Sequence, residues 1–320
     1  MPWSSARVPL AIALGGCSAP LGPPLAHGEH VLEVDRTELV VHVRGNLQSE
    51  LPPAIVISGG PGLAWDYLEL PSAIAERLTL VHLELVGTGA SARLENPREY
   101  SRARDVADIE AVRAHLDVPR IVLVGHSYGG FVALDYALAH PQHVAGLVLY
   151  DTSATSGPEL WTDIRANLES RADAPWFADA TAAFAGSPRS EDDTELSAAF
   201  RRAGPLYLHD YDADPVRWNA WLERVRVSFA RAHGARAEPF DVRARLAELH
   251  VPTLVIVGAS DFVCSPVMAR ALARGISGAE LVVLSASGHF GHVEQPEAFA
   301  AAVLAFTDRV ARMARPRPHV

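Results

Sequence analysis

Short, almost uninterrupted apolar runs recur along the chain, and most of them end in a turn rich in glycine. These runs cover residues 54–57, 78–83, 120–124, 146–150, 253–257 and 281–284. A continuous apolar run, unlike an alternating one, is typical of a parallel strand covered on both faces of its sheet. Weak alternation over 31–43 predicts an opening hairpin, and 103–116 and 131–139 are expected to be helical. Strands that alternate with helices predict an α/β fold, with a mostly parallel sheet and helices on both faces.

This alternation stops between residues 155 and 248. The segment has no strand-like apolar run and contains four of the six tryptophans, Trp161, Trp176, Trp218 and Trp221. We expect several short helices, inserted as a helical cap between residues 31–154 and 249–320, which form the two parts of one sheet domain. A cap over the strand ends would enclose a partly apolar pocket, and Trp176 and Trp218 are candidates to line it.

The first thirty residues are expected to stand apart from the sheet domain, as a signal-like segment and a tether. One basic residue, Arg7, precedes a short apolar stretch and small residues, and Cys17 follows them. This pattern resembles a bacterial lipoprotein signal peptide. Cleavage there would leave Cys17 as an acylated first residue that anchors the protein to a membrane of the cell envelope. The other interpretation is an N-terminal extension on a cytoplasmic enzyme. Residues 18–30, rich in proline and glycine, form a tether in either case.

Composition and charge exclude several classes of protein. Hydrophobic residues make up 49% of the 320 positions and charged residues 21%, which excludes a wholly disordered chain. No apolar run reaches the roughly 18 residues of a membrane-spanning helix, so a multi-span membrane protein is excluded. The net charge of −10 repels phosphate backbones, so no nucleic acid partner is expected. Two cysteines cannot form a zinc site by themselves, and no metal or nucleotide motif is present, so we expect no cofactor. Nothing in the pattern predicts an oligomeric state.

Residues Gly125 to Gly129 fit the pattern G-x-S-x-G. They lie directly after an expected strand and directly before an expected helix, which is the context in which this pattern forms a nucleophile turn. Such a turn is so tight that only small residues fit at its glycine positions, and it exposes the serine hydroxyl. The partly positive N-terminus of the following helix points at the reacting centre. Ser127 is therefore the candidate nucleophile.

With this turn the chain resembles the α/β-hydrolase family over nearly all of residues 31–312. In that family an acid and then a histidine follow the serine along the chain. The resemblance implies Asp261, in the turn after an apolar run, as the acid. It implies His289, in an S-G-H-x-x-x-x-E-x-P pattern after the last run, as the base. The imidazole takes the proton of the serine hydroxyl, and the carboxylate orients the imidazole and stabilises its charged form.

Four neighbouring residues have simpler interpretations. Asp151 follows another apolar run and is the alternative acid, because some relatives carry the acid on that strand. His126, beside the nucleophile, and His292, beyond the base, are expected to be packing or surface residues. Cys264 is expected to be a small apolar filler rather than a second nucleophile.

The loop Ser58-Gly-Gly-Pro-Gly62 resembles the H-G-G-P-G loop of the proline iminopeptidase branch. Glycine lets backbone N–H groups point at a developing oxyanion. By the resemblance, the two donors are the N–H groups of Gly60 and Tyr128. The chain departs from the branch at Ser58, which stands in place of His. It departs again at Glu84 and Val86, which stand in place of Asp and Arg in a D-x-R-G-x-G-x-S segment.

Three functions stay open. The loop and the cap favour a serine aminopeptidase, similar to proline iminopeptidase, that acts on short peptides through an acyl-enzyme, and this is the leading interpretation because the glycine-proline loop is the rarer feature. The departures from the branch favour a carboxylesterase, thioesterase or lactonase that acts on a small acyl substrate. The third function, a binding module on a catalytically dead hydrolase fold, is disfavoured because nucleophile, acid, base and oxyanion donors are all present. An aminopeptidase needs a carboxylate in its cap, since an ammonium group buried without a partner is costly.

Overall fold

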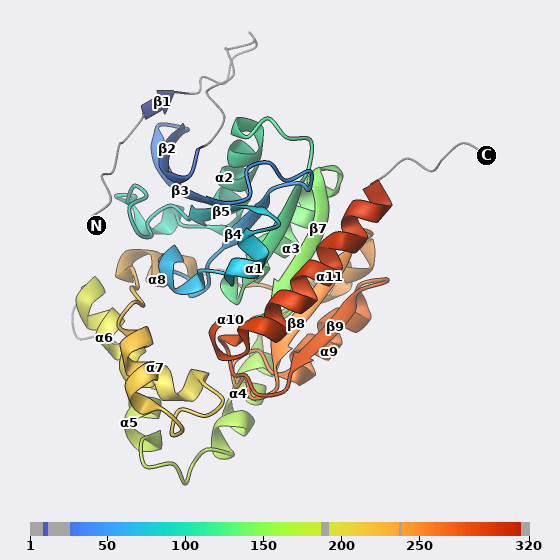
Figure 1. Cartoon of the computed structure of the whole chain (residues 1–320). Coiled ribbons are helices and arrows are strands. Elements are labelled where there is room, and N and C mark those ends of the chain that lie inside the picture. The colour runs from blue at the N-terminus through green and yellow to red at the C-terminus, as the bar shows by residue number, and fades with distance from the viewer. Residues whose placement is uncertain (1–8, 12–25, 187–191, 237–238, 315–320) are drawn as a thin grey trace.

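A nine-stranded sheet organises the chain (Figure 1). The computed structural model describes residues 9–11, 26–186, 192–236 and 239–314. The strands are β1 (Pro9–Ala11), β2 (Gly28–Val34), β3 (Thr37–Gly45), β4 (Ala54–Ile57), β5 (Thr79–Glu84), β6 (Ile121–His126), β7 (Val144–Tyr150), β8 (Thr253–Gly258) and β9 (Glu280–Leu284). Their order is β1-β2-β3-β5-β4-β6-β7-β8-β9. Strand β3 is antiparallel to both of its neighbours, and the other neighbouring pairs are parallel. The predicted, mostly parallel sheet is confirmed.

Helices cover both faces of this sheet. Helix α11 crosses in front of the sheet in Figure 1, whereas α2 and α3 lie behind it. The helices are α1 (Ser72–Ala75), α2 (Arg102–His115), α3 (Tyr128–Ala139), α4 (Pro158–Glu169), α5 (Phe177–Ala185), α6 (Asp193–Ala203), α7 (Pro215–Leu222), α8 (Phe229–Arg236), α9 (Pro266–Gly275), α10 (Gly291–Glu294) and α11 (Pro296–Ala314).

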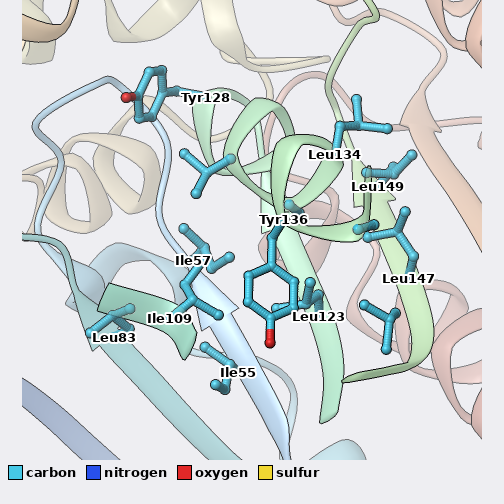
Figure 2. Close-up of a cluster of buried hydrophobic side chains, with 14 of the residues drawn as sticks. Ile55, Ile57, Leu83, Ile109, Leu123, Tyr128, Leu134, Tyr136, Leu147 and Leu149 are labelled. Carbon is cyan, nitrogen blue, oxygen red and sulfur yellow. The ribbon is translucent and has the colours of Figure 1, made fainter. Parts of the chain in front are cut away.

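Each central strand contributes side chains to two separate cores, one on each face. In β4, Ile55 and Ile57 pack with residues of α2 and α3, whereas Ala54 and Val56 belong to the core that contains Phe299 of α11. Figure 2 shows the first of these cores below helix α3. A strand buried in this way needs an apolar residue at every position. This explains why the runs in the sequence are continuous.

The segment between β7 and β8 forms helices α4 to α8, and its described residues add no strand to the sheet. Helices α5, α6 and α7 lie together, apart from the helices that flank the sheet (Figure 1). Helix α8 returns to the sheet domain, where a Cβ atom on Gly234 would lie 2.2 Å from the carbonyl oxygen of Pro97. We propose that residues 155–248 act as the cap.

The lipoprotein-like segment falls almost entirely outside the described residues. Its Pro9–Ala11 portion forms β1, which pairs in parallel with residues 31–33 of β2. Cys17 lies outside the described residues, and its acylation stays a prediction. Strand β2 begins at Gly28, so the expected tether ends before residue 30. In the part of the chain that the structure describes, no helix is both long enough and apolar enough to cross a membrane.

Candidate active site

Strand β6 ends in a strained turn that carries Ser127. This residue has φ 53° and ψ −119°, a left-handed conformation that residues other than glycine rarely adopt, and α3 begins at the next residue. A Cβ atom on Gly125 would lie 2.4 Å from the carbonyl oxygen of Gly129. A Cβ atom on Gly129 would lie 2.3 Å from the carbonyl oxygen of Ile57. The strand–turn–helix arrangement expected around Ser127 is present, and its close backbone contacts require both glycines.

The predicted acid and base meet beside this turn. Nδ1 of His289 lies 2.8 Å from Oδ2 of Asp261, and both side chains are buried. Oδ1 of Asp261 accepts hydrogen bonds from the backbone N–H groups of Val263, at 2.8 Å, and Cys264, at 3.1 Å. Since a carboxylate only accepts, Nδ1 of a neutral His289 donates, and Nε2 is left as the acceptor that a general base needs. Ser127 and His289 line one cavity, so the structure brings all three residues to one site.

Asp151, the alternative acid, is also buried near Asp261. It follows β7 with φ 45°, and its Oδ1 accepts a hydrogen bond from the N–H of Gly258 at 2.8 Å. Burial, and then the negative charge of Asp261, raise the pKa of Asp151 well above its usual value. Oδ2 of Asp261 contacts Nδ1 of His289 at 2.8 Å, whereas Oδ1 of Asp151 contacts the backbone of Gly258. The geometry therefore favours Asp261 as the partner of His289.

Two histidines near the predicted triad are buried in a hydrogen-bonded cluster, so a surface role for either is wrong. Nδ1 of His126 lies 2.7 Å from Oη of Tyr67, and its Nε2 lies 2.9 Å from the carbonyl oxygen of His289. Nδ1 of His292 lies 3.0 Å from Oη of Tyr150, and its Nε2 lies 2.8 Å from the carbonyl oxygen of Tyr67. Mainly through burial, the pKa of His126 is well below its ordinary value and that of His292 is lowered to about 4. Both rings are therefore neutral at pH 7.

The glycine loop after β4 runs directly beside Ser127. Gly60 and Gly62 have φ values of 118° and 107°, a region that favours glycine. A Cβ atom on Gly59 would lie 2.9 Å from Cβ of Ser127. Gly60 and Tyr128, which carry the two expected oxyanion donors, line the same cavity as Ser127.

Glu84, which replaces the family's Asp, holds the turn that follows β5. Its carboxylate accepts hydrogen bonds from the backbone N–H groups of Ala90 and of Ser91, the latter at 3.2 Å. Oε1 of Glu84 lies 3.0 Å from Nε2 of His42. Glu84, although longer than the family's Asp at this position, therefore has both backbone and side-chain hydrogen-bond partners.

Val86 replaces the family's Arg, and an arginine of the predicted cap reaches its backbone. Arg231 of α8 is fully buried, and its Nη2 lies 2.5 Å from Oδ2 of Asp105 in α2, which is equally buried. Nη1 of Arg231 lies 3.5 Å from the carbonyl oxygen of Val86. The hydroxyl of Tyr128 donates to Asp105 at 3.0 Å. In Figure 2 this tyrosine stands at the end of α3, with its hydroxyl turned away from the core. The predicted cap is thus tied to the side chain of the residue that carries an expected oxyanion donor.

A cavity of about 730 Å³ lies over Ser127, with walls from the sheet domain and from the predicted cap. Its walls are largely apolar and include Phe131, Leu160, Trp161, Ile164, Phe184 and Phe240. Among the described lining residues, the side chains that carry a charge at neutral pH are those of Arg102 and Arg165, and none of these lining residues is Asp or Glu. The described walls therefore suit an apolar group and carry no carboxylate that could receive a cation.

The predicted contribution of tryptophans to this cavity is partly wrong. Trp161 lines it and is 51% exposed. Trp176 and Trp218 are not among the described lining residues. Nε1 of Trp176 donates to Asp212 at 3.0 Å, and Nε1 of Trp218 donates to the carbonyl oxygen of Asp210 at 3.2 Å. Both indole groups find their polar partners in the loop before α7, which holds them away from the cavity.

Two groups of histidines and carboxylates in the described residues place ligand atoms within 4.8 Å of one another. The first consists of Glu110, His140 and His143, and the guanidinium of Arg113 binds both carboxylate oxygens of Glu110, at 2.6 and 3.0 Å. The second consists of His126, Asp151 and His289, and both ring nitrogens of His126 already have hydrogen-bond partners. We assign neither group to a metal.

Known proteins agree with this fold. A family model for the alpha/beta hydrolase fold matches residues 52–296. The chain is 27% identical over 277 residues to a proline iminopeptidase of Levilactobacillus brevis, which covers 81% of this chain and 89% of that protein. The solved structure of a hydrolase from Pseudomonas aeruginosa PA01 is 30% identical, with a TM-score of 0.64 over 88% of this chain and 99% of that one. An enol-lactonase from Burkholderia xenovorans LB400 shares the fold at 23% identity, with a TM-score of 0.67 over 87% of this chain and 99% of its own. Taken with the sheet order and the serine turn, these matches show that the chain belongs to the α/β-hydrolase family of enzymes.

Proposed function

We propose that the protein is a serine hydrolase that works through an acyl-enzyme. Ser127 attacks the carbonyl carbon of the substrate while Nε2 of His289 takes the hydroxyl proton, and Asp261 stabilises the imidazolium that forms. The N–H groups of Gly60 and Tyr128 stabilise the oxyanion. The proton on Nε2 then passes to the leaving group. The observation that carries this proposal is the 2.8 Å contact between His289 and Asp261 at the cavity that Ser127 also lines.

The second half of the reaction uses the same groups. Nε2 of His289 removes a proton from water, and the oxygen of that water attacks the acyl carbon. The bond to Oγ of Ser127 then breaks, Oγ regains the proton from His289, and an acid is released.

The cavity supports a small ester, thioester or lactone with an apolar acyl group as the substrate. Its walls provide apolar surface, which favours an acyl chain by about 25 cal/mol for each Å² removed from water. A free N-terminal ammonium group would instead enter a cavity in which the described walls carry Arg102 and Arg165 but no carboxylate. Burying an ammonium group without a partner costs several kcal/mol.

Aminopeptidase activity is the second candidate. The loop 58–62 and the 27% identity to a proline iminopeptidase favour it. It requires a carboxylate that meets the substrate's amine, and the described lining does not supply one.

A substrate profile of the wild-type protein and of Ser127→Ala tests both candidates. The substrates are p-nitrophenyl esters of short and medium acyl chains, arylamides of proline, alanine and leucine, and the N-acetylated form of each arylamide. We expect turnover of the esters, and a loss on the order of 10⁵-fold in Ser127→Ala. Faster turnover of a free-amine arylamide, abolished by acetylation, would establish the aminopeptidase instead. If Ser127→Ala keeps a tenth of the activity, the proposed nucleophile is wrong.

Two further variants test the acid. Asp261→Asn should lower turnover strongly, because the imidazole loses its orientation, whereas Asp151→Asn should stay active. The opposite result would assign the acid to Asp151.

A further inference from the structure

His126, the residue before the nucleophile, has a fully buried ring with a partner at each nitrogen. Oη of Tyr67, in the short 3-10 turn Trp65–Leu68, lies 2.7 Å from Nδ1. The carbonyl oxygen of His289 lies 2.9 Å from Nε2. Tyr67 Oη has a further neighbour, the backbone N–H of Gly59, at 2.7 Å. These four residues come from the glycine loop, the turn after it, the end of β6 and the loop of the base.

The direction of each hydrogen bond follows from the chemistry of the groups. A carbonyl oxygen only accepts, so Nε2 of His126 carries the proton and donates to His289. A neutral imidazole has one proton, so Nδ1 accepts, and the hydroxyl of Tyr67 donates to it. The lowered pKa of the buried His126 is consistent with a neutral ring. Tyr67 Oη in turn accepts from Gly59. Each of these three hydrogen bonds therefore has a defined donor and acceptor, and all three run in one direction, from Gly59 to His289.

This hydrogen-bond chain joins the two sides of the reacting centre. Gly59 precedes Gly60, an expected oxyanion donor, and His289 is the expected base. Ser127 lies between them, directly after His126. A Cβ atom on Gly59 would lie 2.9 Å from Cβ of Ser127 and 3.1 Å from Nδ1 of His126, so the loop and the turn are in direct contact. A change in either ring would alter the position of the oxyanion donor relative to the base.

We propose that Tyr67 and His126 are positioning residues, which hold the oxyanion loop and the backbone of His289 in place on either side of Ser127. This inference rests on the proposed function, because it assumes that Ser127 and His289 react. It differs from a packing role in one respect. Packing requires a flat ring of the right size, whereas positioning requires a donor at Nε2, an acceptor at Nδ1 and the hydroxyl of Tyr67.

Variants that keep the ring and remove the polar groups separate these roles. In Tyr67→Phe, Gly59 loses its acceptor and His126 loses its donor. His126→Phe removes both bonds of the imidazole, while His126→Gln keeps one donor and one acceptor. Tyr136→Phe is the matched control, because Tyr136 is another buried tyrosine, whose hydroxyl donates to Glu110 at 2.7 Å away from the site.

Two kinetic measurements are made, well below the unfolding temperature. The first gives kcat and KM with a p-nitrophenyl ester, and the second gives the second-order rate constant of labelling by a fluorophosphonate. We expect Tyr67→Phe and His126→Phe to lower kcat and the labelling rate by about 10- to 100-fold with little change in KM, as for a small misplacement of catalytic groups. His126→Gln should recover part of the loss, and Tyr136→Phe should match the wild type in both rates.

The inference is overturned if Tyr67→Phe keeps both rates within twofold of the wild type. It is also overturned if Tyr136→Phe loses as much as Tyr67→Phe, because the loss would then be general. If His126→Phe does not fold, Tyr67→Phe decides the question. Failure of the proposed function is distinguishable, since the wild-type protein would then show no labelling, or Ser127→Ala would remain active.

Discussion

Replacing Arg231 by methionine should break the buried ion pair that ties the predicted cap to the sheet domain. Neither Arg231 nor Asp105 has an exposed side chain. Methionine fills much of the same volume but provides no charge and no donor. Asp105 would keep the hydroxyl of Tyr128 as a donor, at 3.0 Å, and lose its counter-ion. An anion would then be left in an apolar interior.

The expected loss follows from this geometry. Removing one partner of a buried ion pair costs about 3–5 kcal/mol, because the other charge is left uncompensated. In a chain of this size each kcal/mol lowers Tm by about 2 °C, so Tm should fall by about 6–10 °C. Adding Asp105→Asn removes the remaining charge and keeps an acceptor for Tyr128. The double variant should therefore be more stable than Arg231→Met alone.

Urea unfolding of the two variants and of Arg243→Met measures these losses. Arg243 also lies in the predicted cap and pairs with Glu159 at 3.0 Å, but both side chains are about half exposed. Exposed pairs contribute little, so this control should unfold close to the wild type. The reasoning is refuted if Arg231→Met is no less stable than Arg243→Met, or if adding Asp105→Asn lowers the stability further.

Three other predictions concern the interior and the serine turn. Neither ring nitrogen of His82 has a hydrogen-bond partner among the described residues, so His82→Phe should raise the free energy of unfolding by about 1–3 kcal/mol, and a loss in urea unfolding would contradict this. Burial lowers the pKa of His82 to about 3 and that of His292 to about 4, so between these values and pH 6.5 the unfolded chain binds more protons than the folded one. The free energy of unfolding should therefore be retained above pH 6.5 and fall as the pH is lowered from about 6.5 to 3, and a constant urea midpoint over this range would refute the prediction. Gly129→Ala should lower kcat at least about 10-fold, because its Cβ atom would meet the carbonyl oxygen of Ile57 at 2.3 Å, and unchanged ester turnover would show that the turn can shift.

The sheet could be predicted from the sequence because the signal for a covered strand is local. The run 54–57 coincides with β4, and the other runs fall within two residues of their strands at each end. The chemistry of the turn at Ser127 is equally local, since two glycines and a serine in five positions specify it. Asp261 and His289 follow strand ends, and the parallel sheet brings these ends to one edge.

Contacts between distant segments could not be predicted in the same way. Tyr67 and His126 are 59 positions apart, and Arg231 and Asp105 are 126 apart. No local period links such residues, and each of them alone fits an ordinary packing or surface role. The tryptophans of the predicted cap show the same limit. A helical pattern indicates that an indole is partly buried, but the hydrogen-bond partners of Trp176 and Trp218 decide which way each ring turns.

The position of Arg231 changes what the family departures imply. Without the structure, Val86 indicates that a charged contact has been lost beside the active site. The structure has a guanidinium against the backbone of Val86, delivered by α8 of the predicted cap. The same guanidinium pairs with Asp105, which receives the hydroxyl of Tyr128. A cation at this place therefore comes from the segment that also forms the cavity walls. Cavity walls and the support of the serine turn share one structural element, so changes in the predicted cap should affect the turn more than in a relative that carries its arginine at position 86.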